Sequence, residues 1–305
     1  MEVEGLLHRY GERVALADVS FTVERGELFA LLGPNGSGKS TLFRILSTLL
    51  RADGGQARVL GHDVVREGAA VRRGLGVVFQ HPSVDGLLTV EENLVHHAHL
   101  HGLGGRALRT RAEEVLRRLG LWERHRERVD RLSGGLKRRV ELAKALLVGA
   151  RALLLDEPST GLDPAARRDF ASYLRELRDS EQLTAVLTTH DMEEAERCDR
   201  VAILDAGRLV AVGTPEALKA QVGGDVIVVR AAAPGALREK VRARFGLEGT
   251  VVDGSLRLER PRGHELLPAL IEAFPDDVQA VTYGKPTLED VLVRLTGHRL
   301  GDGSS

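Results

Sequence analysis

Short, evenly apolar runs recur along the first two thirds of the chain, and they predict the strands of a buried sheet. The runs are Leu28–Leu32, Gly76–Phe79, Ala152–Leu155, Leu183–Thr188 and Val201–Leu204. Most of them are separated by stretches in which apolar positions recur at helical spacing. Because alternating strands and helices are typical of α/β folds, we expect residues 1–221 to share one mainly parallel sheet.

Residues 85–150 interrupt this alternation. After about residue 90 the segment is rich in Leu, Ala, Arg and Glu at helical spacing, and it is broken by Gly102, Gly104 and Gly105. This pattern predicts a helical subdomain inserted into the α/β core.

A second pattern starts after the glycine pair Gly223-Gly224. It predicts, in order, a strand at Val226–Val229, a helix at Gly235–Phe245, two strands around Asp253-Gly254, a helix at Glu265–Phe274, a strand at Val278–Tyr283 and a helix at Leu288–Leu295. The order β-α-β-β-α-β-α is that of a small ferredoxin-like α+β domain. We therefore expect a C-terminal domain over residues 222–298, followed by a frayed tail at 299–305.

Composition and charge narrow the class of protein. Hydrophobic residues make up 43% and charged residues 29% of the chain, as in ordinary globular proteins. The 43 basic and 44 acidic residues nearly cancel, which argues against a nucleic-acid-binding face. A single cysteine, Cys198, is consistent with a reducing compartment, and we expect its side chain to be a small packed residue with no redox role. Without a signal peptide or a membrane-spanning run, we expect a cytoplasmic protein that meets a membrane only through a partner.

A glycine-rich segment joins the strand at Leu28–Leu32 to the next helical stretch. Its residues are Gly33, Pro34, Asn35, Gly36, Ser37, Gly38, Lys39, Ser40 and Thr41. The spacing matches a phosphate-binding loop, in which main-chain N–H groups wrap the phosphates. Lys39 would neutralise the β- and γ-phosphates and the Ser40 hydroxyl would ligate Mg²⁺. The position between a strand and a helix argues against a glycine-rich turn with an exposed lysine.

Two carboxylates follow another predicted strand. Asp156 comes directly after the apolar run Ala152–Leu155, and Glu157 is the next residue. An aspartate at the carboxyl end of such a strand can hold Mg²⁺, and a second carboxylate can polarise the water that attacks the γ-phosphate. The alternative is a strand that ends in a solvated acidic turn.

The sequence Leu132-Ser133-Gly134-Gly135 lies between these two halves, at the start of a helical stretch. It resembles the signature of the ATP-binding cassette (ABC) family, the nucleotide-hydrolysing subunits of ABC transporters. The resemblance covers residues 1–220 and implies a P-loop NTPase fold of the RecA-like type. Leu136 is a departure, because many family members have glutamine there.

The resemblance also assigns roles to other residues. Tyr10 matches the aromatic residue that stacks on adenine, and Gln80 matches the glutamine that contacts Mg²⁺ and the hinge to the helical subdomain. Ser159–Asp163 match the D-loop, and His190 matches the histidine that holds the attacking water and Glu157 in place. Ordinary polar strand ends are the alternative for Gln80 and His190.

The placement of the signature implies a dimer. Ser133 and the amides of Gly134 and Gly135 lie at a helix N-terminus, which favours anions, but they belong to the helical subdomain rather than to the phosphate loop. The resemblance accordingly implies a head-to-tail homodimer with two ATP molecules at its interface. Each site would draw Lys39, Asp156 and Glu157 from one chain and Ser133 from the other.

Other polar clusters have simpler interpretations. A helical stretch carries His96, His97, His99 and His101. Some pairs have metal-like spacing, but no carboxylate or cysteine joins them, so we expect a solvated or partner-facing surface. The pair Arg72-Arg73 and the triplet Lys137-Arg138-Arg139 are too short for nucleic-acid-binding arms. We expect them to be solvated or interface charges.

Two further segments indicate a branch of the family. Gln80–Thr89 and Lys285–Val291 are similar to segments of daunorubicin-resistance-type ABC-2 exporters. The resemblance implies an ATPase subunit, peripheral on the inner face of the cell membrane, that powers export of a drug-like or lipid-like molecule through a separately encoded ABC-2 permease. Export of polysaccharide, haem or ions is an alternative. A soluble ABC ATPase of translation or DNA repair is another, disfavoured by the single cassette and the absence of a basic face.

Overall fold

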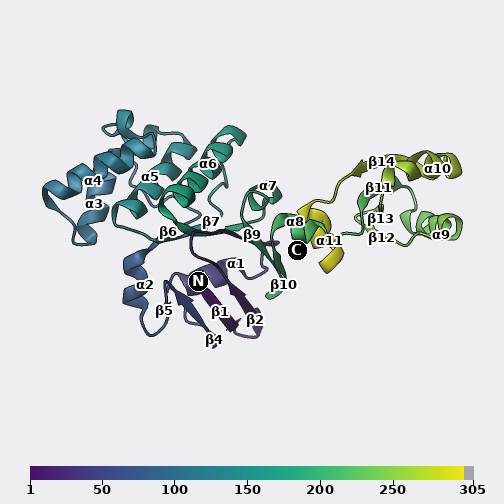
Figure 1. The fold of residues 1–305 in the computed structure, drawn as a ribbon, viewed down its shortest axis with the longest axis horizontal. Coiled ribbons are helices and arrows are strands. Elements are labelled where there is room, and N and C mark those ends of the chain that lie inside the picture. Colours follow the sequence, from purple (N-terminus) through teal and green to yellow (C-terminus); the bar gives the residue numbers. More distant parts are fainter. Residues whose placement is uncertain (299–305) are drawn as a thin grey trace. The chain divides into compact units, whose positions relative to one another are not determined.

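The computed structural model describes residues 1–298 (Figure 1). It divides the chain into two compact units, of which the first is Met1–Leu209 and the second begins at Val210. No helix within the described residues is both long enough and apolar enough to span a bilayer.

The first unit is built on a sheet in the order β10-β9-β3-β8-β7-β6, whose edge strand β10 continues past Leu209. Its strands are β3 (Leu28–Leu32), β6 (Leu75–Val78), β7 (Ala152–Asp156), β8 (Thr184–Thr189), β9 (Arg200–Asp205) and β10 (Arg208–Gly213). The strands from β9 to β6 pair in parallel. All five predicted apolar runs are strands of this sheet. Its central strand β3 is buried along its whole length, which explains its continuous apolar sequence.

A second sheet in this unit was not predicted. It is antiparallel, in the order β2-β1-β4-β5, and comprises β1 (Glu2–Tyr10), β2 (Arg13–Thr22), β4 (Gly54–Val59) and β5 (His62–Asp63). The pairing of β1 with β2 shifts register three times along its length. Such irregularities break the alternation of apolar and polar residues by which a half-buried strand is recognised.

Helices connect these strands. They are α1 (Lys39–Leu46), α2 (Gly68–Gly74), α3 (Val90–Leu100), α4 (Gly105–Arg118), α5 (Gly134–Leu147), α6 (Pro164–Glu181) and α7 (Met192–Ala195), with 3₁₀ turns η1 (Trp122–Arg124) and η2 (Val129–Arg131). Helices α3, α4 and α5 pack on one another and lie between β6 and β7 in the sequence, as the predicted helical insertion requires. In Figure 1, α3 and α4 lie at the left, and α5 lies between them and α6.

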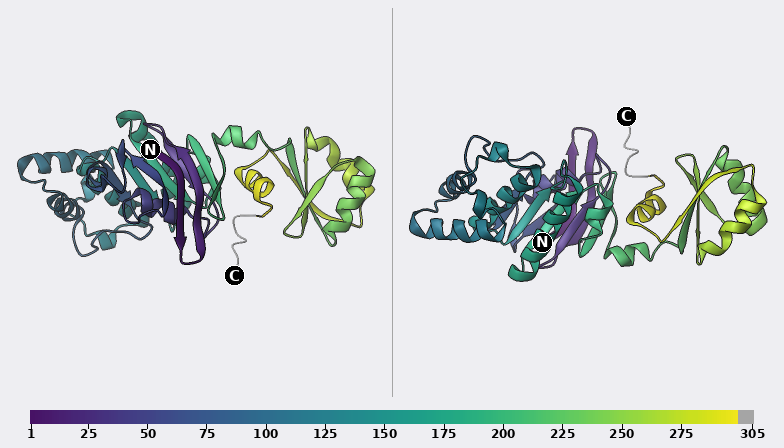
Figure 2. Two further views of the ribbon diagram at one scale, coloured as in Figure 1. Left: turned by 90° about the horizontal axis from the view of Figure 1, so that it is seen from below. Right: turned by 90° about the horizontal axis from the view of Figure 1, so that it is seen from above.

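The second unit contains a four-stranded antiparallel sheet in the order β12-β13-β11-β14. Its elements are α8 (Pro215–Lys219), β11 (Asp225–Ala231), α9 (Pro234–Phe245), β12 (Gly249–Val252), β13 (Ser255–Arg260), η3 (Gly263–Glu265), α10 (Leu266–Ala273), β14 (Val278–Gly284) and α11 (Leu288–Thr296). Helices α9 and α10 lie on one side of the sheet (Figure 2) and share a core with it.

The unit boundary lies upstream of the one that the glycine pair predicts. Helix α8 precedes Gly223 in the sequence, but it packs against α11, near the end of the described chain. The local sequence cannot reveal this long-range packing. The predicted frayed tail at 299–305 lies outside the described residues.

Candidate functional site

Strand β3 leads directly into the glycine-rich loop, and α1 begins at Lys39. Two of the glycines are required by close backbone approaches. A Cβ atom at Gly33 would clash with the carbonyl oxygen of Leu204 on β9. Gly38 has φ of +106° and a Cβ there would lie 2.6 Å from the carbonyl oxygen of Ala15. The loop is therefore wedged between neighbouring strands in a conformation that only glycine adopts without strain.

The ammonium group of Lys39 is held inside this loop. The residue is only 5% exposed, and its Nζ donates to the main-chain oxygens of Gly33 at 2.7 Å and Pro34 at 2.9 Å. Burial lowers the pKa of Lys39, and the nearby carboxylates of Glu157 and Asp156 oppose that shift. A buried cation held by neutral carbonyls is suited to an anionic ligand.

A cavity of about 170 Å³ opens beside this lysine. It is lined by Tyr10, Arg13, Ala15, Asn35, Gly36, Gly38, Lys39, Ser40, Thr41 and Glu157. The N-terminus of α1 contributes its positive dipole end here. The predicted aromatic residue Tyr10 is 45% exposed, so its ring is available to a ligand. These features fit a nucleotide with its phosphates on the loop.

Glu157 follows β7 in an unusual backbone conformation. Its φ is +44°, a left-handed value that is costly for any residue other than glycine. Thr188 on β8 holds it there, because the Glu157 amide donates to the Thr188 carbonyl oxygen at 3.1 Å and to its Oγ1 at 3.0 Å. The same hydroxyl donates to Oδ1 of Asp156 at 2.6 Å. One threonine thus fixes both predicted carboxylates.

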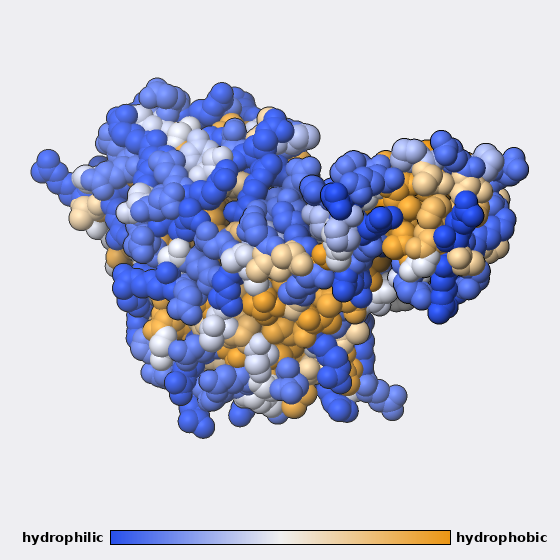
Figure 3. Space-filling model, turned by 45° about the vertical axis from the view of Figure 1, so that its right-hand side comes forward, coloured by the Kyte–Doolittle hydropathy of each residue, from blue (hydrophilic) through white to orange (hydrophobic). Residues whose placement is uncertain are grey.

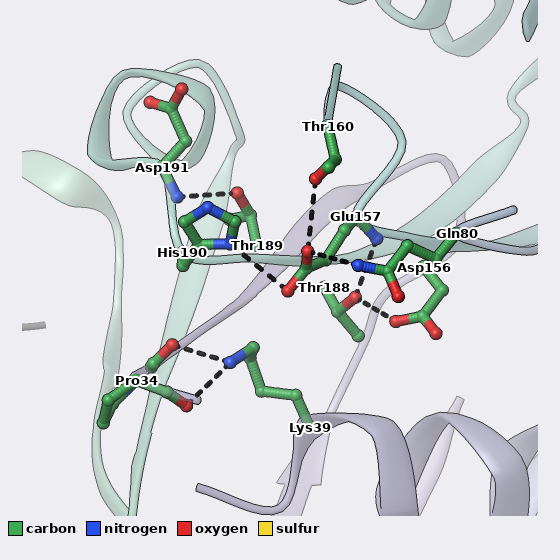
Figure 4. A network of polar contacts seen from close by, with 11 residues as sticks. Pro34, Lys39, Gln80, Asp156, Glu157, Thr160, Thr188, Thr189, His190 and Asp191 are labelled. Atoms are coloured by element: carbon green, nitrogen blue, oxygen red, sulfur yellow. Dashed lines mark hydrogen bonds and ion pairs between the residues drawn. The ribbon is translucent and has the colours of Figure 1, made fainter. Parts of the chain in front are cut away.

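Several polar side chains contact the Glu157 carboxylate (Figure 4). Gln80 Nε2 donates to its Oε2 at 3.0 Å, and the Thr160 hydroxyl donates to the same oxygen at 3.1 Å. His190 Nδ1 lies 3.2 Å from its Oε1. The structure therefore brings three predicted polar residues, Gln80, Glu157 and His190, into direct contact from three separate strand ends.

The signature residues are not part of this cluster. Ser133 caps α5, where its Oγ accepts from the Leu136 amide at 3.4 Å. Ser133 and Gly134 are exposed, whereas Gly135 is buried against Ala166. None of the three signature residues lines the cavity beside Lys39.

Thr188 and Arg13 belong to the site but were not predicted. Thr188 lies on β8, two residues before His190, and it pairs with Asp156 where β8 runs parallel to β7. Aligning the carboxyl ends of the two predicted strands could have found it. Arg13 reaches the cavity from β2, in the antiparallel sheet that the sequence did not reveal.

The histidine cluster on α3 was predicted to be a solvated or partner-facing surface. No group of three His, Cys, Asp or Glu side chains within residues 1–298 is arranged to hold a metal ion. His97 is partly buried, and its burial together with Lys144 and His101 lowers its pKa to about 4.

The expectation of a solvated or interface charge is wrong for Arg138, which is 3% exposed. The packing of α5 against the β6 loop, which a local sequence does not show, buries it.

Comparisons with known proteins agree with this geometry. The ABC transporter family model matches residues 16–160. The chain is 42% identical to the daunorubicin resistance ATP-binding protein DrrA3 of Streptomyces coeruleorubidus, over 97% of this chain and 95% of the relative. It is 32% identical to the linearmycin resistance ATP-binding protein LnrL of Bacillus subtilis (strain 168), over 99% and 100%. It is 38% identical to the Nod factor export ATP-binding protein I of Burkholderia orbicola, over 96% of each.

Solved structures show the same likeness. The cbiO1 subunit from Clostridium perfringens, part of the ABC transporter complex cbiONQ, superposes with a TM-score of 0.68 at 28% identity, over 80% of this chain and 95% of that one. A dimeric ATP-binding cassette in a post-hydrolysis state, bound to ADP and Pi, gives a TM-score of 0.61 at 26% identity, over 70% and 97%. This chain therefore belongs to the ATP-binding proteins of ABC transporters, among the relatives of the daunorubicin-resistance ATP-binding proteins, and it is an ATPase.

Proposed function

We propose that this ATPase binds ATP with Mg²⁺ beside Lys39 and hydrolyses it in a head-to-tail homodimer, to power export through a separate membrane permease. The observation that carries the proposal is the convergence on Glu157. A buried lysine on one strand end and a carboxylate held in a left-handed conformation on another form a phosphate site with a base beside it.

In this proposal the glycine-rich loop binds the phosphates, and residues of the loop and of β7 bind the metal. The amides of the segment 33–41 and the ammonium of Lys39 would hold the β- and γ-phosphates. Ser40 and Asp156 offer the oxygen ligands that Mg²⁺ prefers. Gln80 is the third proposed metal contact, and its side chain lies nearby because it donates to Glu157, the residue after Asp156. The metal supplies charge stabilisation on the phosphate oxygens when it is bound. Tyr10 would stack on the adenine.

Glu157 is the proposed general base. Its carboxylate accepts from Gln80 and Thr160 and meets His190, so its orientation is fixed by three partners. A positioned base removes a proton from the attacking water, and His190 holds the base and the water in line.

The proposed dimer supplies the missing anion site. Ser133 and Gly134 are exposed at the N-terminus of α5, a 14-residue helix, and do not line the cavity of their own chain. In a head-to-tail dimer they would cap the γ-phosphate bound to the other copy. Family members dimerise and work with separate permeases, which supports this arrangement.

The names of the relatives support export of a drug-like or lipid-like molecule. Two are named for resistance to daunorubicin or linearmycin and one for Nod factor export. An ABC-2 type permease and a place on the inner face of the cell membrane go with this proposal. Export of polysaccharide, haem or ions is the second candidate.

We further propose that residues 222–298 form a ferredoxin-like accessory domain that assists assembly. The antiparallel order β12-β13-β11-β14 and the two helices on one side of the sheet support this fold. Hydrophobic side chains gather on part of this unit's surface among hydrophilic ones (Figure 3), as on an interaction module.

The substitution Glu157→Gln tests the proposal. The amide keeps the shape of the phosphate site but cannot act as a base, so the variant should bind ATP, fail to hydrolyse it and elute as a dimer from size-exclusion chromatography with ATP and Mg²⁺. Lys39→Ala, which removes the phosphate contact, is the control and should remain monomeric. A variant that binds ATP and stays monomeric would contradict the dimer.

Transport is tested with the permease present. Cells that express the chain together with its candidate permease should accumulate less daunorubicin than cells in which the chain carries Glu157→Gln. Equal accumulation would contradict daunorubicin as cargo, and the same pair of strains would then be compared for polysaccharide, haem and sodium export.

A further inference from the structure

A buried ion pair ties α5 to the loop that follows β6. Arg138 Nη1 lies 2.8 Å from Glu141 Oε2, one turn apart on α5, and their side chains are only 4% and 2% exposed. Burying two charges carries a desolvation penalty that their mutual attraction often only balances. The pair is therefore poorly explained by stability alone, and its other contacts show what it does.

The guanidinium of Arg138 holds the main chain around Gln80. Its Nη1 donates to the carbonyl oxygen of Phe79 at 2.6 Å, and its Nη2 donates to the carbonyl oxygen of Gln80. The planar fork of arginine binds two successive carbonyls and a carboxylate here, through donors that the rigid guanidinium holds in a fixed geometry. The backbone of Gln80 is thus attached to α5, while its side chain binds Glu157.

Glu141 secures the other end of the same loop. Its Oε1 accepts from the amide of Ser83 at 2.7 Å and from the Ser83 hydroxyl at 3.1 Å. Lys144, one turn further along α5, donates to the Ser83 carbonyl oxygen at 2.5 Å. The segment 79–83 is consequently fastened to one face of α5 at both of its ends.

Helix α5 also carries the signature. Ser133 is its N-cap, and Arg138 lies five residues further on, about 7.5 Å along the axis at 1.5 Å per residue. Because Ser133 and Arg138 belong to one regular helix, a displacement of the Gln80 backbone can be passed along it to Ser133. Without the ion pair, only the Lys144 hydrogen bond to Ser83 and the packing of α5 on β6 would join the loop to the helix, and neither holds the Gln80 carbonyl.

We propose that Arg138, with Glu141, is a positioning residue that makes the segment 79–83 and α5 a single rigid piece. A change at Glu157 caused by nucleotide, sensed by the Gln80 side chain, is thereby passed to Ser133, which must reach the γ-phosphate on the other copy. This inference rests on the roles proposed above for Gln80 and Ser133.

The first test removes both charges together, in Arg138→Met/Glu141→Gln, so that no unpaired charge stays buried. We expect kcat for ATP to fall at least about 10-fold with KM within about 2-fold, because alignment is lost and the phosphate loop is untouched. Arg139→Met is the matched control, since this neighbouring arginine pairs with the exposed carboxylate of Asp169. It should leave kcat unchanged. A wild-type kcat in the double variant, or an equal loss in the control, would overturn the proposal.

The second test asks whether Arg138 acts through Gln80. If it does, Gln80→Ala combined with Arg138→Met/Glu141→Gln should be no slower than the more impaired of the two parents. Multiplicative losses would mean that the ion pair acts independently of Gln80 and would refute the mechanism.

The third measurement uses the unaltered chain, so it does not depend on how any variant folds. Hydrogen exchange with and without ATP and Mg²⁺ should change together at residues 79–83 and 133–138. Change in only one segment contradicts the rigid connection. The dimer formed by Glu157→Gln separates the two proposals: if that dimer forms and the segments still respond separately, only the rigid connection fails.

Discussion

Nδ1 of His190 lies 3.2 Å from Oε1 of Glu157, across two adjacent parallel strands. The Glu157 side chain is 14% exposed and the His190 side chain 52% exposed, so the histidine covers the carboxylate from the solvent side. The imidazole can therefore orient the proposed base by direct contact.

Replacing His190 by alanine should lower kcat by about 100-fold or more, the range for losing a group that positions proton transfer. KM for ATP should change little, because His190 does not line the cavity beside Lys39. Steady-state ATPase assays measure both constants. His96→Ala, an exposed histidine on α3, is the control. A kcat within 3-fold of the wild type would exclude the positioning role.

Replacing Thr188 by valine should impair both stability and catalysis. The change keeps the side-chain shape and the main-chain carbonyl, but it removes the hydroxyl that accepts from the Glu157 amide and donates to Asp156. We expect the free energy of unfolding to fall by about 1–3 kcal/mol, together with kcat. Chemical denaturation and ATPase assays measure the two effects.

Thr184→Val provides the matched control on the same strand. Thr184 accepts from the Gly26 amide at the opposite end of β8, far from the two carboxylates. It should lower stability without a comparable loss of kcat. If both valine variants lose the same activity, Thr188 has no special part in holding the site.

Catalysis shared between chains predicts complementation. Ser133→Arg and Lys39→Ala should each be inactive, but a heterodimer of the two contains one composite site with both residues intact. If equal amounts of the two chains paired at random, about a quarter of all sites would be whole, so the mixture should recover activity on the order of that fraction of the wild type. If heterodimers are demonstrated by crosslinking and the mixture stays as inactive as its parents, the shared site is refuted.

Removing the second unit should separate nucleotide binding from assembly. We would end the chain after Gly213, because α8 packs against α11 and would be left unsupported by a later cut. Titration with a fluorescent ATP analogue should show near-normal affinity, since Tyr10, Lys39 and Asp156 all lie upstream. Dimerisation or co-purification with the permease should weaken. Normal assembly would make this unit a passive appendage, and lost binding in a folded truncation would give it a part in the site.

The sequence by itself predicted the parallel sheet, the helical insertion and the glycine-rich loop, but not the antiparallel sheet β2-β1-β4-β5. Strand β3 and the glycine loop were predictable because a continuous apolar run followed by closely spaced glycines has one simple structural solution, a buried strand leading to a phosphate-binding turn. Asp156 and Glu157 were predictable because they follow an apolar strand at the carboxyl edge of a parallel sheet, whereas Gln80 and His190, which also follow strands, were assigned from the resemblance to the ABC family.

Only the tertiary structure decided how these residues are held. Thr188 looks like any strand threonine until β7 lies beside it, and Arg138 looks like one of three solvated cations until α5 packs on the loop after β6. The antiparallel sheet and the packing of α8 on α11 likewise depend on partners distant in the sequence. A local pattern records which face of an element is apolar, but the hydrogen bonds of a buried polar group depend on which element covers it.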